Sequence, residues 1–268
     1  MIISLEPEKD TTINFLNIKK NSIVISTIET KITIEEYDIS KYLDIITNIF
    51  NNYFIHKLDL LIEDENYLKK INSTTNTINI NSICVYYDYY EDFHAHFLEI
   101  LVFLKKISDL KSLDLVFICS LSSEHAEAMS LYINSNKNIV ELSLQDPHAY
   151  SISLTDDDLI KIFSNTSLKK ITIDVSECYY FCEFITKFII HNKTLINITI
   201  NYYDNYYLEY GNYPNEKVYK CLKFNYSIES IIFGDVKIPD FINDIFQRNK
   251  KLPKINFMLE NNFDINII

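Results

Sequence analysis

The sequence predicts an α/β fold: a right-handed α/β solenoid with parallel strands on a concave face and helices on a convex face. Two observations predict it. The phrase apolar-x-x-apolar-x-apolar returns along the 268-residue chain, and its copies lie about 28 residues apart. Between the copies, apolar residues change from the spacing of a strand to that of a helix. Such units bury their apolar sides only by stacking on one another.

The strands are predicted from the end of each phrase, where apolar residues alternate with polar ones and Ile, Leu and Val dominate. In the clearest copies an Asn precedes the phrase by three residues. These copies are Asn136 with Ile139, Leu142, Leu144; Asn165 with Leu168, Ile171, Ile173; Asn192 with Leu195, Ile198, Ile200; Asn225 with Ile228, Ile231, Phe233; and Asn249 with Leu252, Ile255, Phe257. Earlier copies are Ile55, Leu58, Leu60; Ile80, Ile83, Val85; Leu110, Leu113, Leu115; and a worn first copy at Ile32 and Ile34.

The helices are predicted from apolar residues three, four, seven and eight positions before a junction Asn, a pattern that places them on one helical face. The predicted N-caps are Ser122, Asp156 and Asp240. Each junction Asn is predicted to lie at a helix exit in the left-handed conformation, because the chain has only two glycines for that role.

The predicted organisation is a single domain in three parts. Residues 1–37 form an N-terminal β cap, because the strands at 13–18, 22–27 and 31–36 are too close together for intervening helices. Residues 38–259 form about eight or nine irregular units, and residues 260–268 form a closing segment.

Residues 40–259 resemble the leucine-rich repeat family, in its long-repeat, ribonuclease-inhibitor-like class. The family's units carry an N-x-[ST]-L junction followed by L-x-x-L-x-L. The resemblance implies an arc that recognises proteins through its concave strand face and the adjoining loops. The family usually places another Asn after the phrase, and its absence here predicts an irregular arc. The residues at that position are Ile118, Pro147, Ser176, Tyr203 and Val236.

Composition narrows the class of partner and the compartment. A formal net charge of −12 disfavours nucleic acid and anionic membranes. The N-terminus is acidic, no apolar stretch approaches the length of a membrane helix, and five cysteines are an odd number. We therefore expect a soluble cytoplasmic protein with reduced thiols. We expect no cofactor, since two isolated glycines cannot form a phosphate loop, and the sequence does not indicate the oligomeric state.

A binding surface is predicted where tyrosines and carboxylates follow the strands. Stacking brings these loops together along one rim, and tyrosine offers a large rigid area with a polar tip. The acidic rim would suit a protein with a basic surface; the alternative is that a compositional bias fills loops with Tyr. The candidate binding residues are Tyr86, Tyr87, Asp88, Tyr89, Asp146, His148, Tyr150, Tyr179, Tyr202, Tyr203, Asp204, Tyr206 and Tyr207. Small polar residues are predicted to face solvent on the concave sheet: Asp59, Cys84, Asp114, Ser143, Thr172 and Thr199.

Metal sites are not predicted. His94 and His96 open a predicted helix over 92–107, where residues two apart do not share a face. Cys178 and Cys182 with His191 lack a fourth ligand. The acidic run at 156–158 is typical of a helix N-terminus rather than a cation site.

The predicted function is a non-enzymatic scaffold or adaptor for protein interactions. One alternative is a divergent enzyme or effector with a site on the strand-exit loops, its candidates being Asp146, His148 and Cys178. Another is a ubiquitin-ligase substrate receptor, although residues 1–37 are predicted to be strands rather than a helical recruitment box.

Overall fold

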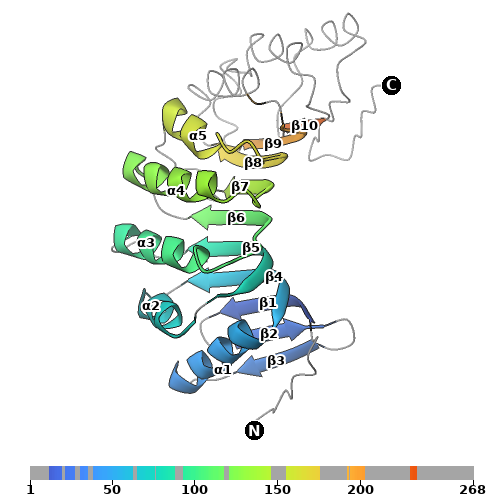
Figure 1. Ribbon diagram of the computed structural model, residues 1–268, viewed down its shortest axis with the longest axis vertical. Helices are drawn as coiled ribbons and strands as arrows, with labels where there is room; N and C mark the ends of the chain where they lie inside the picture. The colour runs from blue at the N-terminus through green and yellow to red at the C-terminus, as the bar shows by residue number, and fades with distance from the viewer. Residues whose placement is uncertain are drawn as a thin grey trace, which may run out of the picture. The chain divides into compact units, whose positions relative to one another are not determined.

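The computed structural model describes residues 12–19, 22–27, 31–35, 39–62, 65–75, 77–87, 93–117, 121–145, 155–175, 192, 194–202 and 230–233. The chain divides into two compact units, Met1–Val116 and Phe117–Ile268. In each unit helices alternate with largely parallel strands, which confirms the α/β class (Figure 1).

The first unit is a mixed sheet covered by helices on one side. Its strands lie in the order β6-β5-β4-β1-β2-β3. The first three strands along the chain form an antiparallel meander, and β1 also pairs in parallel with β4, which pairs in parallel with β5. The strands are β1 (Thr12–Lys19), β2 (Ser22–Ser26), β3 (Lys31–Glu35), β4 (Phe54–Ile62), β5 (Asn79–Tyr87) and β6 (Ser112–Phe117).

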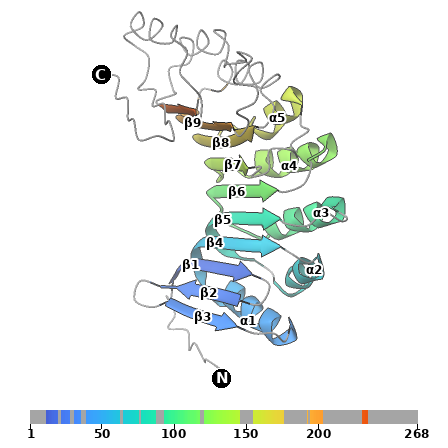
Figure 2. The same ribbon diagram turned by 180° about the vertical axis from the view of Figure 1, so that it is seen from behind.

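Three helices lie on the same side of this sheet (Figure 2). They are α1 (Ile39–Asn52), α2 (Glu65–Thr74) and α3 (Phe93–Leu104), and α2 packs against both of the others. The strands predicted at 13–18, 22–27 and 31–36 are all present, and α3 lies within the helix predicted over 92–107.

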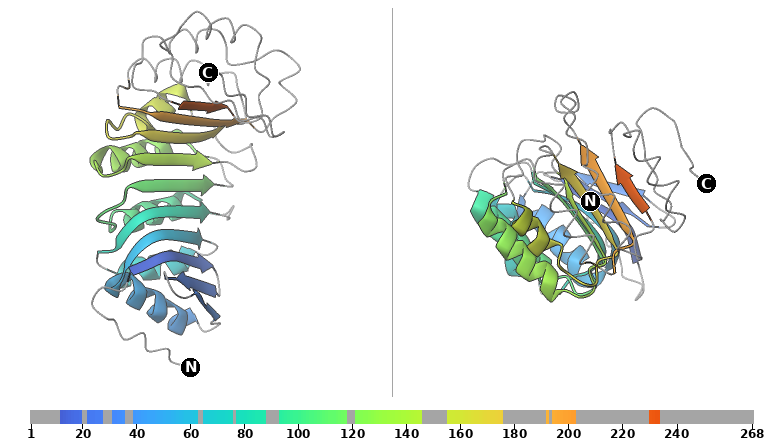
Figure 3. Two further views of the ribbon diagram at one scale, coloured as in Figure 1. Left: turned by 90° about the vertical axis from the view of Figure 1, so that its right-hand side faces the viewer. Right: turned by 90° about the horizontal axis from the view of Figure 1, so that it is seen from above.

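In the second unit, the described strands lie in the order β10-β9-β8-β7, and each is parallel to its neighbour (Figure 3). Helices α4 (Ser123–Ser135) and α5 (Asp156–Ile162) pack against each other. The strands are β7 (Glu141–Gln145), β8 (Lys170–Val175), β9 (Asn197–Tyr202) and β10 (Ser230–Phe233).

The apolar phrase forms the core in the register that its repetition predicts. In the first unit Leu58 lies opposite Ile83, and in the second unit Leu142, Ile171 and Ile198 follow one another across the sheet. All five side chains are at most 2% exposed. Full burial of one such side chain contributes about 1.5–3 kcal/mol, so a phrase in register stabilises each strand pair.

The first copy of the phrase, however, lies in β1, whereas the sequence predicted an incomplete first copy at Ile32 and Ile34. Those two residues belong to β3, which is separated from β4 by β1 and β2. The strand next to β4 carries Ile13, Leu16 and Ile18, which lie opposite the first, second and third apolar residues of the β4 phrase. The prediction was wrong because the β2–β3 hairpin and α1 lie between β1 and β4, so the spacing exceeds one repeat.

Helix starts follow the predicted caps closely. Ser122 is the N-cap of α4, as predicted. Helix α5 begins at Asp156, and its N-cap is Thr155, so the predicted cap at Asp156 was wrong by one residue. The hydroxyl of Thr155 accepts from the Asp158 backbone at 3.2 Å, while the Asp158 carboxylate accepts from the Thr155 backbone at 3.1 Å. The predicted cap Asp240 lies outside the described residues.

The junction Asn residues turn the chain through their side chains. The Oδ1 atoms of Asn136, Asn165 and Asn192 each accept from the backbone N–H two residues ahead, at 3.1, 2.8 and 2.9 Å. These are Asx turns. The expected left-handed conformation is wrong for Asn136, whose φ of −98° and ψ of 97° are extended. Asn serves at this helix exit as a local hydrogen-bond acceptor.

Two side chains also donate to carbonyls at the end of an earlier helix. The Asn165 amide donates to the carbonyls of Ile133 at 2.6 Å and Asn136 at 3.0 Å, at the end of α4. In the first unit the Lys106 ammonium donates to the carbonyl of Asn72 and, at 2.6 Å, to that of Thr75, at the end of α2. The last carbonyls of a helix lack the regular partners of its interior, and these side chains from later in the chain supply donors to them.

Candidate functional site

The face of the first unit's sheet that points away from the core carries polar side chains in rows. Alternate residues of a strand point to opposite faces, so the residues between the buried phrase positions share this face. In one row Asn17 lies opposite Asp59, which lies opposite Cys84 on the next strand. We call the following set the open face: Phe15, Asn17, Lys57, Asp59, Leu61, Ser82, Cys84, Tyr86 and Asp114.

The centre of the open face is a thiol between two carboxylates. The Cys84 thiol donates to Oδ2 of Asp114 on β6, with a sulfur–oxygen distance of 3.5 Å. On the other side of Cys84, Asp59 occupies the paired position on β4. The parallel register therefore places one acidic residue on each side of Cys84, Asp59 on β4 and Asp114 on β6.

Asp59 is a partly desolvated carboxylate. Burial raises its pKa above the usual 3.8, and the positive charge of Lys57 opposes that rise. The Lys57 ammonium lies 3.6 Å from Oδ1 of Asp59. That oxygen is buried and has no hydrogen-bond partner in the part of the chain that the structure describes. The contact of this oxygen is therefore the ion pair with Lys57 rather than a hydrogen bond.

Cys84 is a poor nucleophile. Burial and the negative charge of Asp114 raise its pKa to about 12, so the thiol stays protonated near neutral pH. The prediction that Cys84 faces solvent was wrong, because only 5% of its surface is exposed. The sequence alternation placed Cys84 on the correct face but could not show that its neighbours would cover it.

Aromatic residues flank the carboxylates. Tyr86 is 42% exposed, and its interaction with Cys84 raises the pKa of its hydroxyl. The Lys57 ammonium lies 5.7 Å from the centre of the Phe15 ring, within range of a cation–π interaction. The open face thus combines carboxylates with a large, partly exposed aromatic side chain, a combination common at recognition surfaces.

The structure describes only three of the predicted binding residues. Tyr86 and Tyr87 belong to β5 rather than to the loop after it, and Tyr202 is the last residue of β9. Tyr87 was wrongly assigned to an exposed rim: it is 1% exposed, and its hydroxyl shares a hydrogen bond with Nδ1 of His96. The predicted residues outside the described chain are Asp88, Tyr89, Asp146, His148, Tyr150, Tyr179, Tyr203, Asp204, Tyr206 and Tyr207.

The residues weighed as metal ligands have other surroundings where they are described. His96 is buried beside Tyr87, with which it also makes a ring contact at 5.6 Å. Among the described residues, no group of three or more His, Cys, Asp and Glu side chains is placed to hold a metal ion. Cys178, Cys182 and His191 lie outside the described residues.

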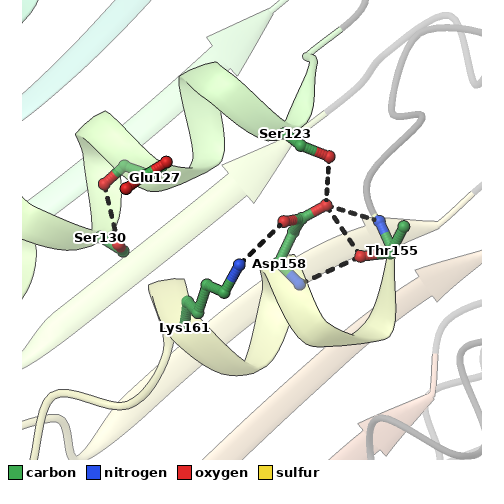
Figure 4. Close-up of polar contacts among 6 residues, drawn as sticks. All are labelled: Ser123, Glu127, Ser130, Thr155, Asp158 and Lys161. Carbon is green, nitrogen blue, oxygen red and sulfur yellow. Dashed lines mark hydrogen bonds and ion pairs between the residues drawn. The ribbon is translucent and has the colours of Figure 1, made fainter.

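A second polar cluster joins the starts of α4 and α5 (Figure 4). Oδ2 of Asp158 accepts from the hydroxyls of Ser123 and Thr155, both at 2.8 Å, and Oδ1 lies 3.7 Å from the Lys161 ammonium. Burial alone raises the pKa of Asp158, but these hydrogen bonds and the charge of Lys161 outweigh it and lower the pKa below 3.8. The acidic run therefore caps and joins helices, and sequence patterning missed the bond from Ser123.

The described residues define an α/β protein with largely parallel strands, a polar open face in its first unit, and helices whose ends accept side-chain hydrogen bonds from later in the chain. No model of a protein family and no curated protein matches the sequence. None of the described helices combines the length and the apolar character that a membrane crossing requires.

Proposed function

We propose that this protein is a non-enzymatic scaffold for protein interactions with a leucine-rich-repeat-like architecture. In this proposal the repeats form an irregular right-handed solenoid with its strands on the concave side. The odd number of cysteines, without the paired spacings of a disulfide framework, favours the cytoplasm as its compartment. The open face is then part of the concave surface, and the Tyr-rich loops after the strands extend it.

The observation that carries the proposal is the register of the phrase. Because the apolar residues of neighbouring strands lie opposite one another, the polar residues between them also form continuous rows. Repeat proteins bind partners through such extended surfaces, whose side chains differ from one repeat to the next. The three described helices of the first unit lie on the opposite side of the sheet.

The chemistry of the open face favours a partner that presents Lys or Arg. Asp59 and Asp114 place two carboxylates on this face, on strands separated by β5, and the Asp59 side chain is 16% exposed. A cationic donor from a partner would form a charge-assisted hydrogen bond, the stronger kind in proteins, with a carboxylate oxygen that solvent can reach. Tyr86 offers an exposed ring beside it for the stem of the same side chain.

Binding is favoured over catalysis on the open face because its thiol is protonated at neutral pH. A catalytic cysteine needs a lowered pKa, usually from a nearby cation or a helix N-terminus, whereas Asp114 raises the pKa of Cys84. The residues considered for an enzyme, Asp146, His148 and Cys178, lie outside the described residues and add no support to that alternative.

The test is quantitative affinity capture from the native cell with the full-length chain, followed by mass spectrometry. The double variant Asp59→Asn/Tyr86→Ser removes one charge and one exposed ring from the open face. We expect the wild type to retain a reproducible basic protein and the variant to lose it, with about tenfold less recovered if a single well-formed ion pair and the ring are removed.

A matched control is Glu127→Gln/Leu131→Ser, which removes one charge and one large exposed side chain from α4. The control should retain the partner at the wild-type level. Equal capture by the wild type and by the open-face variant would show that the open face does not bind, provided that circular dichroism finds both folded.

A further inference from the structure

Two rows of side chains lie next to each other on the open face, one acidic and one apolar. The acidic row crosses the strands β4, β5 and β6 through Asp59, Cys84 and Asp114. The apolar row lies two residues further along the strands, where Leu61 on β4 is opposite Tyr86 on β5. A partner that covers this part of the open face has to match a fixed order of charge and apolar surface.

Solvent reaches both rows. Tyr86 is 42% exposed and the Asp59 side chain is 16% exposed, whereas Cys84 is 5% exposed. Asp114 and Leu61 are partly exposed, and the three described helices of the first unit lie on the other side of the sheet (Figure 2). A partner can therefore contact the carboxylates and the tyrosine ring at the same time, with the thiol beneath it.

The spacing of the two carboxylates favours a helical partner. Neighbouring strands lie about 4.8 Å apart, so Asp59 and Asp114, on strands separated by β5, lie about 10 Å apart across the sheet. In a helix, residues seven apart share a face and are separated by about 10.5 Å along the axis. Residues on one face of an extended chain are about 7 or 13 Å apart. A helix laid across the strands therefore aligns two basic residues with the two carboxylates.

The position of Tyr86 fits the same helix. A residue four positions after the first basic residue lies about 6 Å further along the axis and is rotated by about 40° to one side. This advance is close to the step from β4 to β5, and Tyr86 lies on β5 to one side of the acidic row. An apolar residue at that position would pack on the tyrosine ring.

Lys57 restricts the other side of the helix. Its ammonium is 3.6 Å from Oδ1 of Asp59 and 5.7 Å from the centre of the Phe15 ring, and its side chain is 55% exposed. Lys57 precedes Asp59 by two residues, so it lies on the side of the acidic row away from Leu61. It would repel a basic residue placed there, so the partner's cations have to form one narrow stripe.

We propose that the open face binds a basic amphipathic helix that lies across the strands, with Arg or Lys at two positions seven apart and a large apolar residue between them. The cations contact Asp59 and Asp114, and the apolar residue packs on Tyr86. This inference rests on the proposed function and specifies the kind of partner. Charge complementarity selects a basic helix over a second copy of this chain, whose net charge is −12.

The test is fluorescence anisotropy of labelled alanine-rich peptides with the full-length protein. The probe has Arg at two positions seven apart and Leu four positions after the first, and we expect a dissociation constant on the order of 10–100 μM. A peptide of the same composition with its Arg residues five apart should bind about tenfold more weakly, because the second Arg then points away from the sheet. A probe with a central Pro should lose affinity to a similar extent, since it cannot stay helical.

Substitutions on both sides locate the contacts. Asp59→Asn and Asp114→Asn should each weaken the probe by about fivefold. Gln in place of one Arg should abolish the effect of one of these substitutions, and Gln in place of the other Arg should abolish the effect of the other. The matched control is Asp44→Asn, an exposed change on α1, which should bind the probe like the wild type. Circular dichroism confirms that the variants are folded.

Equal affinities for the three Arg-containing peptides, or binding by none of them, would overturn the helical partner. Neither result needs a variant protein. The proposed function would still stand if affinity capture from the native cell depended on Asp59 and Tyr86. Equal capture by the wild type and by the open-face variant would remove both proposals.

Discussion

The side-chain amide of Asn165 donates a 2.6 Å hydrogen bond to the backbone carbonyl of Ile133, although the two residues are 32 positions apart in the sequence. Asn165 is 1% exposed, so its amide and the carbonyl are both removed from water. The end of α4 therefore gains a donor from a residue that follows α5. In the first unit, the Lys106 ammonium likewise donates to carbonyls at the end of α2.

Replacing Asn165 with Ala should destabilise the second unit by about 1–3 kcal/mol. The variant removes the side-chain donors to the carbonyls of Ile133 and Asn136, of which only that of Ile133 also accepts from the Asn136 backbone N–H, and an unsatisfied buried group costs about 1–3 kcal/mol. Urea unfolding followed by circular dichroism measures the loss. Lys137→Ala, an exposed change beside the same turn, is the control and should cost less than about 0.5 kcal/mol. Equal midpoints for the two variants would contradict the capping role of Asn165.

Lys106→Met should destabilise the first unit by about 2 kcal/mol, whereas Lys105→Met should have little effect. The Lys106 ammonium holds two helix-terminal carbonyls, but Lys105 is exposed. Both substitutions remove one positive charge, so the comparison isolates the hydrogen bonds from the net charge. The measurement is the free energy of unfolding, and indistinguishable variants would show that water replaces the Lys106 donors without cost.

Asp158 should make the free energy of unfolding depend on pH. Its pKa is lowered in the folded protein, so the unfolded chain binds more protons in this range and stability is present above the usual pKa of 3.8. That contribution is lost as pH falls through the folded pKa. The difference in unfolding free energy between the wild type and Asp158→Asn should therefore shrink from neutral pH to below 3.8.

The control for this titration is Asp157→Asn, which changes an exposed neighbour in the same helical turn. We expect its difference from the wild type to vary less with pH than that of Asp158→Asn. A constant difference between the wild type and Asp158→Asn across the titration would contradict the contribution assigned to the hydrogen bonds from Ser123 and Thr155.

Cys84 should resist alkylation in the folded protein. With its pKa raised from 9.0 to about 12, the thiolate fraction falls on the order of 1000-fold, before any effect of burial on access. Mass spectrometry of the Cys84 peptide after iodoacetamide treatment compares the native and the urea-unfolded chain. Asp114→Asn removes a negative charge and should speed the reaction, while Asp109→Asn should not. A native rate equal to the unfolded rate would rule out the protected thiol.

The strands were predictable because their cause is local and repeated. A phrase such as Leu142 and Leu144 alternates over a few residues, and burial of one face is its only stable outcome. The copy at β1 was missed although Ile13, Leu16 and Ile18 have the same pattern. In the sequence, β1 is separated from its partner β4 by the β2–β3 hairpin and α1. This separation is longer than one repeat, so a search for copies one repeat apart does not find the pair.

The candidate site was less predictable because it depends on neighbouring strands. Alternation placed Asp59 and Cys84 on the same face, and the parallel register brought them together as expected. The burial of Cys84 and the raised pKa of Asp59 come from packing that no single strand encodes. Tyr87 was misplaced for a related reason: a run of tyrosines after a strand resembles a loop, whereas β5 extends through Tyr87 and directs it into the core.

The pairing of β1 with β4 has a consequence for how the chain folds. The β1–β2–β3 meander joins residues that are near one another in sequence, so its loops are short and can close early. The β1–β4 ladder must wait until the hairpin, α1 and β4 itself are available. Closing so long a loop costs more chain entropy than the meander, so we expect this contact to form later and a ribosome-bound chain ending before Phe54 to lack a stable N-terminal sheet.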